Sequence, residues 1–154
     1  QQADFTASNF LGFADFCGSN FACDADFSNS GFRGPADLSR ATFSEKINLH
    51  DAQFRKNVHF ESSEINKINL TQTRYEWLFL KWNSINHLDF DDGAYQTLID
   101  NYKKLQWQTD SSDCSSTYLE AIVQAAPNDS HLWIINGIRS LVLGTNSSSF
   151  PGQI

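Results

Sequence analysis

The sequence predicts an α+β protein: a β-solenoid of about three coils over residues 1–71, a cap of about four helices over residues 72–144 and a tail over residues 145–154. Two observations lead to this prediction. Large apolar residues recur at alternating steps of five and six over residues 5–65, a spacing that neither a helix nor a long strand produces. After Thr73 the apolar spacing changes to three and four, which is typical of amphipathic helices.

The repeat has a period of eleven residues and places two large apolar residues in each period. A small residue, nearly always Ala or Ser, stands two positions before each large one, with a polar residue between them. This alternation between two faces indicates extended backbone. The first apolar column is Phe5, Phe16, Phe27, Leu38, Leu49 and Phe60, and the second is Phe10, Phe21, Phe32, Phe43, Phe54 and Ile65.

Each extended piece is only about three residues long before the pattern restarts. A chain that turns every five or six residues and always points an apolar side chain inward coils around an axis, which makes a β-solenoid. An eleven-residue coil has little room for two Phe and two small residues, so we expect four segments and about 22 residues per coil. Gly12, Gly34 and Pro35 fall at the longer steps, where they suit corners.

The unit Ala-Asp-Phe begins at Ala3, Ala14 and Ala25 and continues as Ala36-Asp37-Leu38. This unit resembles that of the pentapeptide-repeat family, in its eleven-residue variant, over residues 3–71. The resemblance implies a right-handed, four-sided β-helix. Most members of the family have no known activity, and a few resemble DNA and act on type II topoisomerases. The following helices resemble the helical segment of archaeal pentapeptide-repeat proteins that are often anchored to membranes.

Composition and charge exclude several classes of protein. The chain is 40% hydrophobic and 19% charged, unlike a disordered or an ordinary membrane protein. Its net charge of −7 argues against binding nucleic acid through phosphates. A mimic of nucleic acid stays open, but residues 1–71 carry nine acidic and six basic side chains. Three coils also span only about 15 Å.

Four helices are expected after the repeat, and the first covers residues 74–82. The third is capped by Ser112 or Asp113, and the fourth follows Pro127 and ends near Gly144. Residues 132–143 are apolar but too few to span a bilayer, which takes about twenty. We therefore expect no transmembrane segment and a buried packing helix there, with an interfacial or partner-binding helix as the alternative. The second helix starts at Asp91-Asp92-Gly93 and places on one face Tyr95, Leu98, Ile99, Tyr102 and Leu105.

The sequence contains no phosphate loop, nucleophile motif or His/Cys constellation, so we expect no enzyme, no cofactor and no metal. Asp91 and Asp92 suit a helix cap better than an acid/base pair. On a coil of about 22 residues the repeat aspartates stack in pairs on opposite faces. Such pairs suit a cation or imitate phosphates; the alternative is a solvated face where Asp suits the turn. The pairs are Asp4 with Asp26 and Asp15 with Asp37.

Cys17 and Cys23 lie on adjacent segments of the repeat and are the disulfide candidate, which leaves Cys114 free. Three small buried hydrophobic residues are the alternative. The chain begins Gln-Gln and contains no Met, which indicates a removed signal peptide; a chain trimmed by other means is the alternative. The candidate glycosylation sites are Asn69, Asn128 and Asn146.

These observations predict a non-enzymatic structural or protein-interaction protein that is extracellular or envelope-associated and self-assembles. Its expected partner is itself, in a homo-oligomer or filament, or another protein. The self-association candidates are Ala3, Phe5 and Phe10, because the first coil has an open apolar end while the expected helix at 74–82 covers the last coil. The alternative function is an acidic, DNA-mimicking inhibitor of a DNA-binding enzyme.

Overall fold

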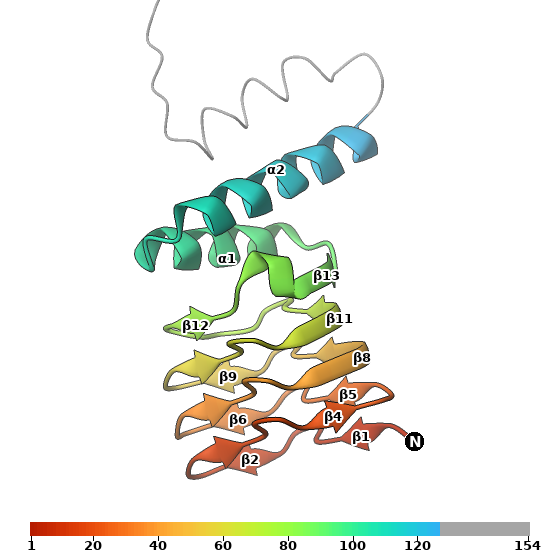
Figure 1. Cartoon of the computed structure of the whole chain (residues 1–154), viewed down its shortest axis with the longest axis vertical. Coiled ribbons are helices and arrows are strands. Elements are labelled where there is room, and N and C mark those ends of the chain that lie inside the picture. Colours follow the sequence, from red (N-terminus) through yellow and green to blue (C-terminus); the bar gives the residue numbers. More distant parts are fainter. Residues whose placement is uncertain (127–154) are drawn as a thin grey trace, which may run out of the picture.

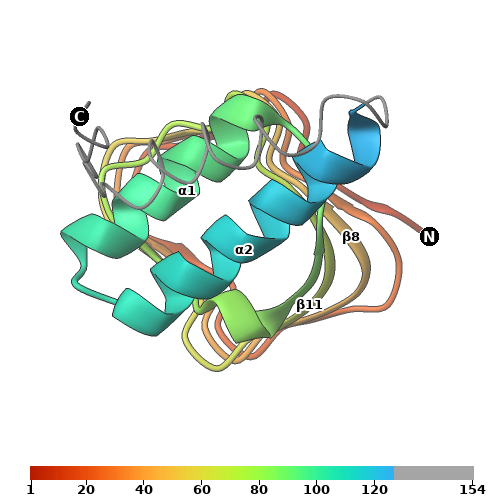
Figure 2. The ribbon, with the colours of Figure 1, turned by 90° about the horizontal axis from the view of Figure 1, so that it is seen from above.

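A computed structural model describes residues 1–126 and shows a stack of β-coils with two helices at one end (Figure 1). The strands pair in parallel from coil to coil, so the β-solenoid predicted from the repeat is confirmed. Seen from above, the helices α1 (Asp92–Lys104) and α2 (Gln108–Ala125) lie across the stack (Figure 2). No helix within residues 1–126 has the length and apolar character needed to cross a bilayer.

Four successive coils share one pattern of short strands connected by tight corners. Coil 1 contains β1 (Ala3–Asp4), β2 (Asn9–Phe10), β3 (Ala14–Asp15) and β4 (Asn20–Phe21). Coil 2 contains β5 (Ala25–Asp26), β6 (Gly31–Phe32), β7 (Ala36–Asp37) and the start of β8 (Thr42–Asn48). Coil 3 contains the end of β8, β9 (Gln53–Phe54), β10 (Val58–His59) and the start of β11 (Glu64–Asn69). Coil 4 contains the end of β11, β12 (Leu78–Phe79), the 3₁₀ helix η1 (Trp82–Ser84) and β13 (Ile85–Leu88).

The register of the strands gives the length of each coil. Along one side, the stacked residues are Ala3, Ala25, Ile47, Ile68 and Leu88. The first two coils therefore have the expected 22 residues, and the next two have 21 and 20. The shortening begins where β11 shifts its register against β8, between Ile65 and Lys67. The solenoid thus has about four coils, not three, and it continues past residue 71.

The two predicted apolar columns form the core of the solenoid. Because equivalent residues stand on neighbouring coils, their aromatic rings stack face to face. The ring centroids of Phe10 and Phe32 are 4.5 Å apart, and those of Phe32 and Phe54 are 4.4 Å apart. In coils 2 and 3 the column residues Phe27, Leu38, Phe43, Leu49, Phe60 and Ile65 are at most 2% exposed.

The repeat aspartates have a local structural role at the corners. The Asp4 carboxylate accepts a hydrogen bond from the Thr6 N–H at 2.9 Å, which is an Asx turn. Five further side chains accept the same hydrogen bond from the backbone N–H two residues later: Asp15, Asp26, Asp37, Asn48 and Asn69. The next residue then adopts the left-handed region, as in Ala7 (φ 55°) and Gly18 (φ 69°). This geometry supports the reading in which Asp suits the turn.

The helix expected over residues 74–82 is wrong. Arg74 bridges to Gln53, and β12 pairs with β10, so this segment belongs to coil 4. Leu78 and Leu80 point inward and are buried, whereas Phe79 between them is half-buried on the outer side. The spacing of the apolar residues in this segment fits both a strand and a helix. The segment forms a strand because the edge of coil 3 offers backbone hydrogen bonds that only a strand can accept and donate.

The two described helices differ in how well the sequence predicts them. Helix α1 starts as expected, with the Asp91 carboxylate accepting from the Ala94 N–H at 2.8 Å. Of its expected apolar face, Leu105 follows the last helical residue and is half-buried, whereas the other four residues are buried. Helix α2 begins at Gln108, before the expected caps Ser112 and Asp113. Residues 1–126 contain two α-helices, and the fourth expected helix and the tail lie outside the described residues.

Candidate interaction site

The helices close the C-terminal end of the solenoid with buried polar contacts. The Asn101 side chain of α1 donates to the Leu78 carbonyl at 2.8 Å and accepts from the Leu78 N–H at 3.1 Å. The Asp110 carboxylate of α2 accepts from the Trp82 N–H at 2.8 Å and from Lys81 Nζ at 3.1 Å. These side chains occupy backbone groups that a further strand would otherwise bind. The expected closure of this end is confirmed, but α1 and α2 provide it.

Apolar and aromatic contacts complete this lid. The Lys81 ammonium lies 3.7 Å from the centroid of the Trp107 ring, and Lys104 lies over Trp77 at 4.2 Å. Cys114 is fully buried in α2, and burial, with a smaller effect of the nearby Asp110 charge, raises the pKa of its thiol to about 12. Burial also raises the pKa of the Tyr102 hydroxyl above its ordinary range. Burial in the lid therefore favours the neutral forms of Cys114 and Tyr102.

The N-terminal end of the solenoid lacks such a lid among the described residues. Strands β1, β2 and β3 are the last strands of their sheets, and β4 pairs only with β8. The N–H groups of Ala3 and Phe5 donate to the backbone carbonyls of Asp24 and Asp26, on the side of coil 2. No described element lies against the other side of coil 1 (Figure 1). Coil 1 therefore presents a strand edge on each of its four sides.

An aromatic surface fills the middle of this end, and we call it the N-terminal face: Ala3, Phe5, Phe10, Phe16 and Phe21. All five residues are half-buried. One coil further in, the equivalent Phe27 and Phe32 are 0% and 2% exposed. The structure thus brings together the three association candidates Ala3, Phe5 and Phe10. Sequence reasoning did not assign Phe16 and Phe21 to this surface, although they belong to the same apolar columns.

Two further apolar side chains lie beside the N-terminal face. Leu11 and Phe13 occupy the corner between β2 and β3 and are 66% and 61% exposed. At this corner Gly34 of coil 2 lies so close to Gly12 that an added Cβ would meet the Gly12 carbonyl oxygen at 2.4 Å. Only glycine fits at position 34, which explains the Gly in this corner of the repeat.

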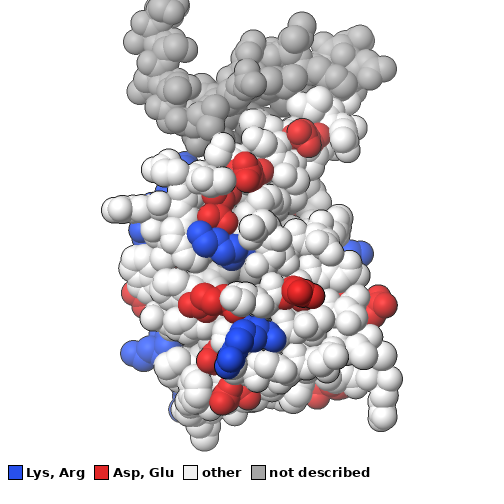
Figure 3. All heavy atoms as spheres, viewed as in Figure 1, with Lys and Arg blue, Asp and Glu red and all other residues white. Residues whose placement is uncertain are grey.

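A polar rim surrounds the N-terminal face. The outward residues on the four sides of coil 1 are exposed and alternate between aspartate and asparagine: Asp4, Asn9, Asp15 and Asn20. Residues 1–32 contain four acidic residues and no Lys or Arg. Figure 3 shows acidic atoms near this end of the viewed face, with basic atoms above them. The rim is therefore acidic and the middle is apolar.

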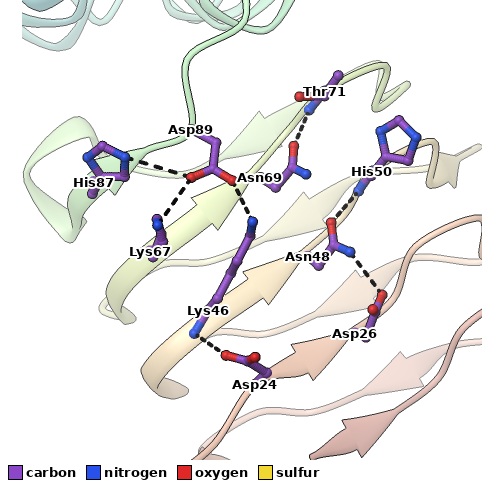
Figure 4. A network of polar contacts seen from close by, with 10 residues as sticks. All are labelled: Asp24, Asp26, Lys46, Asn48, His50, Lys67, Asn69, Thr71, His87 and Asp89. Atoms are coloured by element: carbon purple, nitrogen blue, oxygen red, sulfur yellow. Dashed lines mark hydrogen bonds and ion pairs between the residues drawn. The ribbon is translucent and has the colours of Figure 1, made fainter.

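One side of the solenoid carries a network of charged side chains (Figure 4). Lys46, Lys67 and His87 stack on β8, β11 and β13. The Asp89 carboxylate lies 2.6 Å from Lys46 Nζ, 3.9 Å from Lys67 Nζ and 3.7 Å from His87 Nε2. The Asp24 carboxylate accepts from the Lys46 N–H at 3.1 Å. These contacts bring one carboxylate to the Lys46 and Lys67 ammonium groups and tie coil 4 to coils 2 and 3.

A polar groove of about 530 Å³ lies on the adjacent part of the same strands. Asn66 Nδ2 donates to the Ser44 carbonyl across it at 3.1 Å. The polar residues of its lining are neutral except for Glu64. It is lined by Thr42, Phe43, Ser44, Ser63, Glu64, Ile65, Asn66, Asn83, Ser84 and Asn86.

The three cysteines are free thiols in the structure. Cys17 Sγ accepts from Arg40 Nη2 at 2.9 Å and from Ser39 Oγ at 3.4 Å, and Cys23 Sγ accepts from the amino group of Gln1 at 3.4 Å. The bridge between Cys17 and Cys23 is not formed here, and their pairing in an oxidising environment stays a prediction.

The structure brings together Asp15 and Asp37, which the sequence predicts to stack as a pair, and it adds Cys17 to them. Ligand atoms of Asp15, Cys17 and Asp37 lie within 4.8 Å of one another. The Arg40 guanidinium already contacts the Cys17 sulfur, so a cation there would meet a like charge. The two carboxylates also accept the turn hydrogen bonds of their own corners.

The predicted glycosylation sites receive different placements. Asn69 lies in β11, is half-buried and accepts from the Thr71 N–H at 2.9 Å. Asn128 and Asn146 lie outside the described residues. The use of the three sequons stays a prediction.

No family model, curated protein or solved structure matches the chain. The structure itself establishes a β-solenoid of stacked parallel coils, with a period near 22 residues, followed by helices.

Proposed function

We propose that this chain is a non-enzymatic interaction protein that assembles with a second copy of itself through the N-terminal face. The contrast between the two ends supports this most. Asn101 and Asp110 bind the backbone of Leu78 and Trp82 in coil 4, whereas the strand edges of coil 1 lack a described partner on their outer side and its rings are only half-buried. An unpaired edge beside exposed apolar surface is a template for association.

We propose membership of the pentapeptide-repeat family, with right-handed coiling, on the resemblance of residues 3–71 and the coil length near 22 residues. An extracellular or envelope location is part of the same proposal, in agreement with its three sequons. The alternative function, a DNA mimic, has less support. Its acidic columns end after two coils, because Asp26 is followed by Asn48 and Asp37 by His59.

Analytical ultracentrifugation of the 154-residue chain over a range of concentrations tests the association. The parent should form a reversible oligomer, and the double variant Phe5→Ser/Phe10→Ser should be monomeric. Phe90→Ser is the matched control, because Phe90 is 53% exposed but lies between β13 and α1, at the end that the helices cover. Circular dichroism identifies any variant that fails to fold. A parent that is monomeric at high concentration, or a double variant that assembles as well as the parent, contradicts the proposal.

A further inference from the structure

We infer that the assembly is a closed dimer of two chains stacked N-terminal face to N-terminal face, with a two-fold axis through two opposite corners of the square coil. The inference rests on the proposed self-association and adds its geometry. Head-to-tail stacking requires access to coil 4, but α1 and α2 lie across it (Figure 2), and Asn101 and Asp110 bind the backbone of Leu78 and Trp82. A single open face paired with itself gives a two-fold, self-limiting dimer.

The polar rim decides which two-fold arrangement forms. A two-fold axis across the solenoid reverses the direction of coiling, so each strand of coil 1 meets a strand of the partner's coil 1 in antiparallel orientation. The axis passes either through the middle of two opposite sides or through two opposite corners. Around the coil the outward residues are, in order, Asp4, Asn9, Asp15 and Asn20.

An axis through the middle of two sides places aspartate against aspartate. Asp4 then faces Asp4 of the partner subunit or Asp15 of the partner subunit, and like charges directly opposite are destabilising. An axis through two corners exchanges adjacent sides, so each aspartate faces an asparagine on the partner. The molecule already contains this contact between coils, because Asn48 Nδ2 donates to the Asp26 carboxylate at 3.2 Å.

The apolar middle is compatible with either arrangement. The inward residue following each of the four strand positions is Phe on every side, and stacked coils already pair Phe5 with Phe27 at 4.7 Å and 11°. Aromatic contact therefore supplies attraction in both cases. The choice between them comes from the match of carboxylates with amides.

The acidic rim also sets how salt affects the dimer. Each N-terminal end brings Asp4, Asp15 and Asp24, and residues 1–32 contain no Lys or Arg. The Arg40 guanidinium of coil 2, which contacts Cys17, offsets only part of this charge. The two rims repel each other at low ionic strength. The screening length for exposed charges falls from about 30 Å at 0.01 M salt to about 10 Å at 0.1 M, so added salt weakens this repulsion. The dimer should therefore tighten as salt is added. Asp4→Asn/Asp15→Asn should tighten it about threefold at low salt and flatten this dependence.

Cysteine cross-linking tests the position of the axis. In a background with Cys17→Ser and Cys23→Ser, each single variant Asp4→Cys, Asn9→Cys, Asp15→Cys, Asn20→Cys or Glu120→Cys is prepared separately. Pairs are then mixed under mild oxidation. We expect Asp4→Cys to cross-link with Asn9→Cys or with Asn20→Cys, but not with itself or with Asp15→Cys. Glu120 is exposed on α2, so its variant reports on head-to-tail stacking.

The outcomes separate this inference from the proposed function. A chain that sediments as a monomer overturns both. A dimer in which Asp4→Cys cross-links with itself or with Asp15→Cys keeps the self-association and overturns the corner axis. Cross-linking of Asp4→Cys with Glu120→Cys overturns the closed dimer in favour of a filament. Unchanged affinity and salt response in Asp4→Asn/Asp15→Asn overturn the role of the rim.

Discussion

At one end of this solenoid the last coil lies under two helices; at the other no described element lies against the outer side of the first coil. Coil 4 has Leu78 hydrogen-bonded to Asn101 through both its N–H and its carbonyl group. Coil 1 has the same backbone and the same inward column, but its rings are only half-buried. The comparison shows that each repeat unit stabilises its neighbours, and that a terminal coil needs a partner of another kind.

The largest expected effect comes from comparing two residues of the first apolar column, Phe27 in coil 2 and Phe5 in coil 1. Phe27→Ala should lower the free energy of unfolding by about 3–5 kcal/mol, because Phe27 is 0% exposed between coils. Phe5→Ala should cost about 1–2 kcal/mol in the monomer, because its ring is half-buried. Chemical denaturation at low protein concentration measures both. Equal losses would mean that coil 1 is as well covered as coil 2.

The second prediction compares asparagines at the two ends. Asn101→Ala should cost about 2–3 kcal/mol, because it leaves the N–H and carbonyl groups of Leu78 buried without partners. Asn20→Ala on the exposed rim of coil 1 should cost less than about 0.5 kcal/mol. Urea titrations give both values. A small loss for Asn101→Ala would show that water or another group replaces the lid contact.

The third prediction concerns alkaline pH and the lid. Burial raises the pKa of the Cys114 thiol to about 12, so unfolding releases its proton at a lower pH. This stabilisation is complete below the unfolded pKa of about 8.5 and is lost as pH rises toward 12, by at most about 1.4 kcal/mol per pH unit. Cys114→Ala should make stability between pH 8 and 10 less dependent on pH, as urea midpoints at the two values will show. An unchanged slope would place the titration elsewhere, for example on Tyr102.

The smallest effect is expected on the outer columns. A hydrogen bond from Ser39 lowers the pKa of Asp37 despite partial burial, and bonds from Ser28 and Asn48 outweigh burial to lower that of Asp26. This stabilisation is present above the unfolded pKa of about 3.9 and is lost as pH falls through the folded value. Asp26→Asn keeps the turn acceptor and should cost less than about 0.5 kcal/mol at pH 7.

Asp26→Ala serves as the control, because it removes the acceptor for Ser28 and should cost more than Asp26→Asn. Carboxyl chemical shifts followed between pH 6 and about 2 should show that Asp26 and Asp37 titrate below the ordinary aspartate pKa of about 3.9. If both carboxyl groups titrate at the ordinary aspartate pKa, the corner hydrogen bonds do not stabilise the carboxylates as proposed.

Regularity decided how much of the fold was predictable. The columns that begin at Phe5 and Phe10 hold their spacing over twelve units. The sequence therefore predicted which side chains point inward and how many residues make one coil. The segment around Leu78 and Leu80 kept the inward alternation but lost the small residue and the Asp that marked each unit. Its aromatic residues then fitted helical spacing equally well, and coil 4 was missed.

The candidate site was predicted in its central residues and missed in its rim. Ala3, Phe5 and Phe10 were expected at an open end because the repeat starts there. The alternation of Asp4, Asn9, Asp15 and Asn20 is visible in the sequence, but its meaning depends on all four lying on one coil. Likewise, Asp110 shows no signal in the sequence for its bonds to Lys81 and Trp82.

By itself the sequence determined the solenoid, its inward ladders and its polar corners, because these depend on contacts that recur at a fixed interval. Only the tertiary structure decided after which residue the coils give way to helices and which helices cover the last coil. Those features depend on single contacts between distant, unrepeated residues, such as Asn101 with Leu78. A backbone edge binds whichever partner reaches it, and no local pattern encodes that partner.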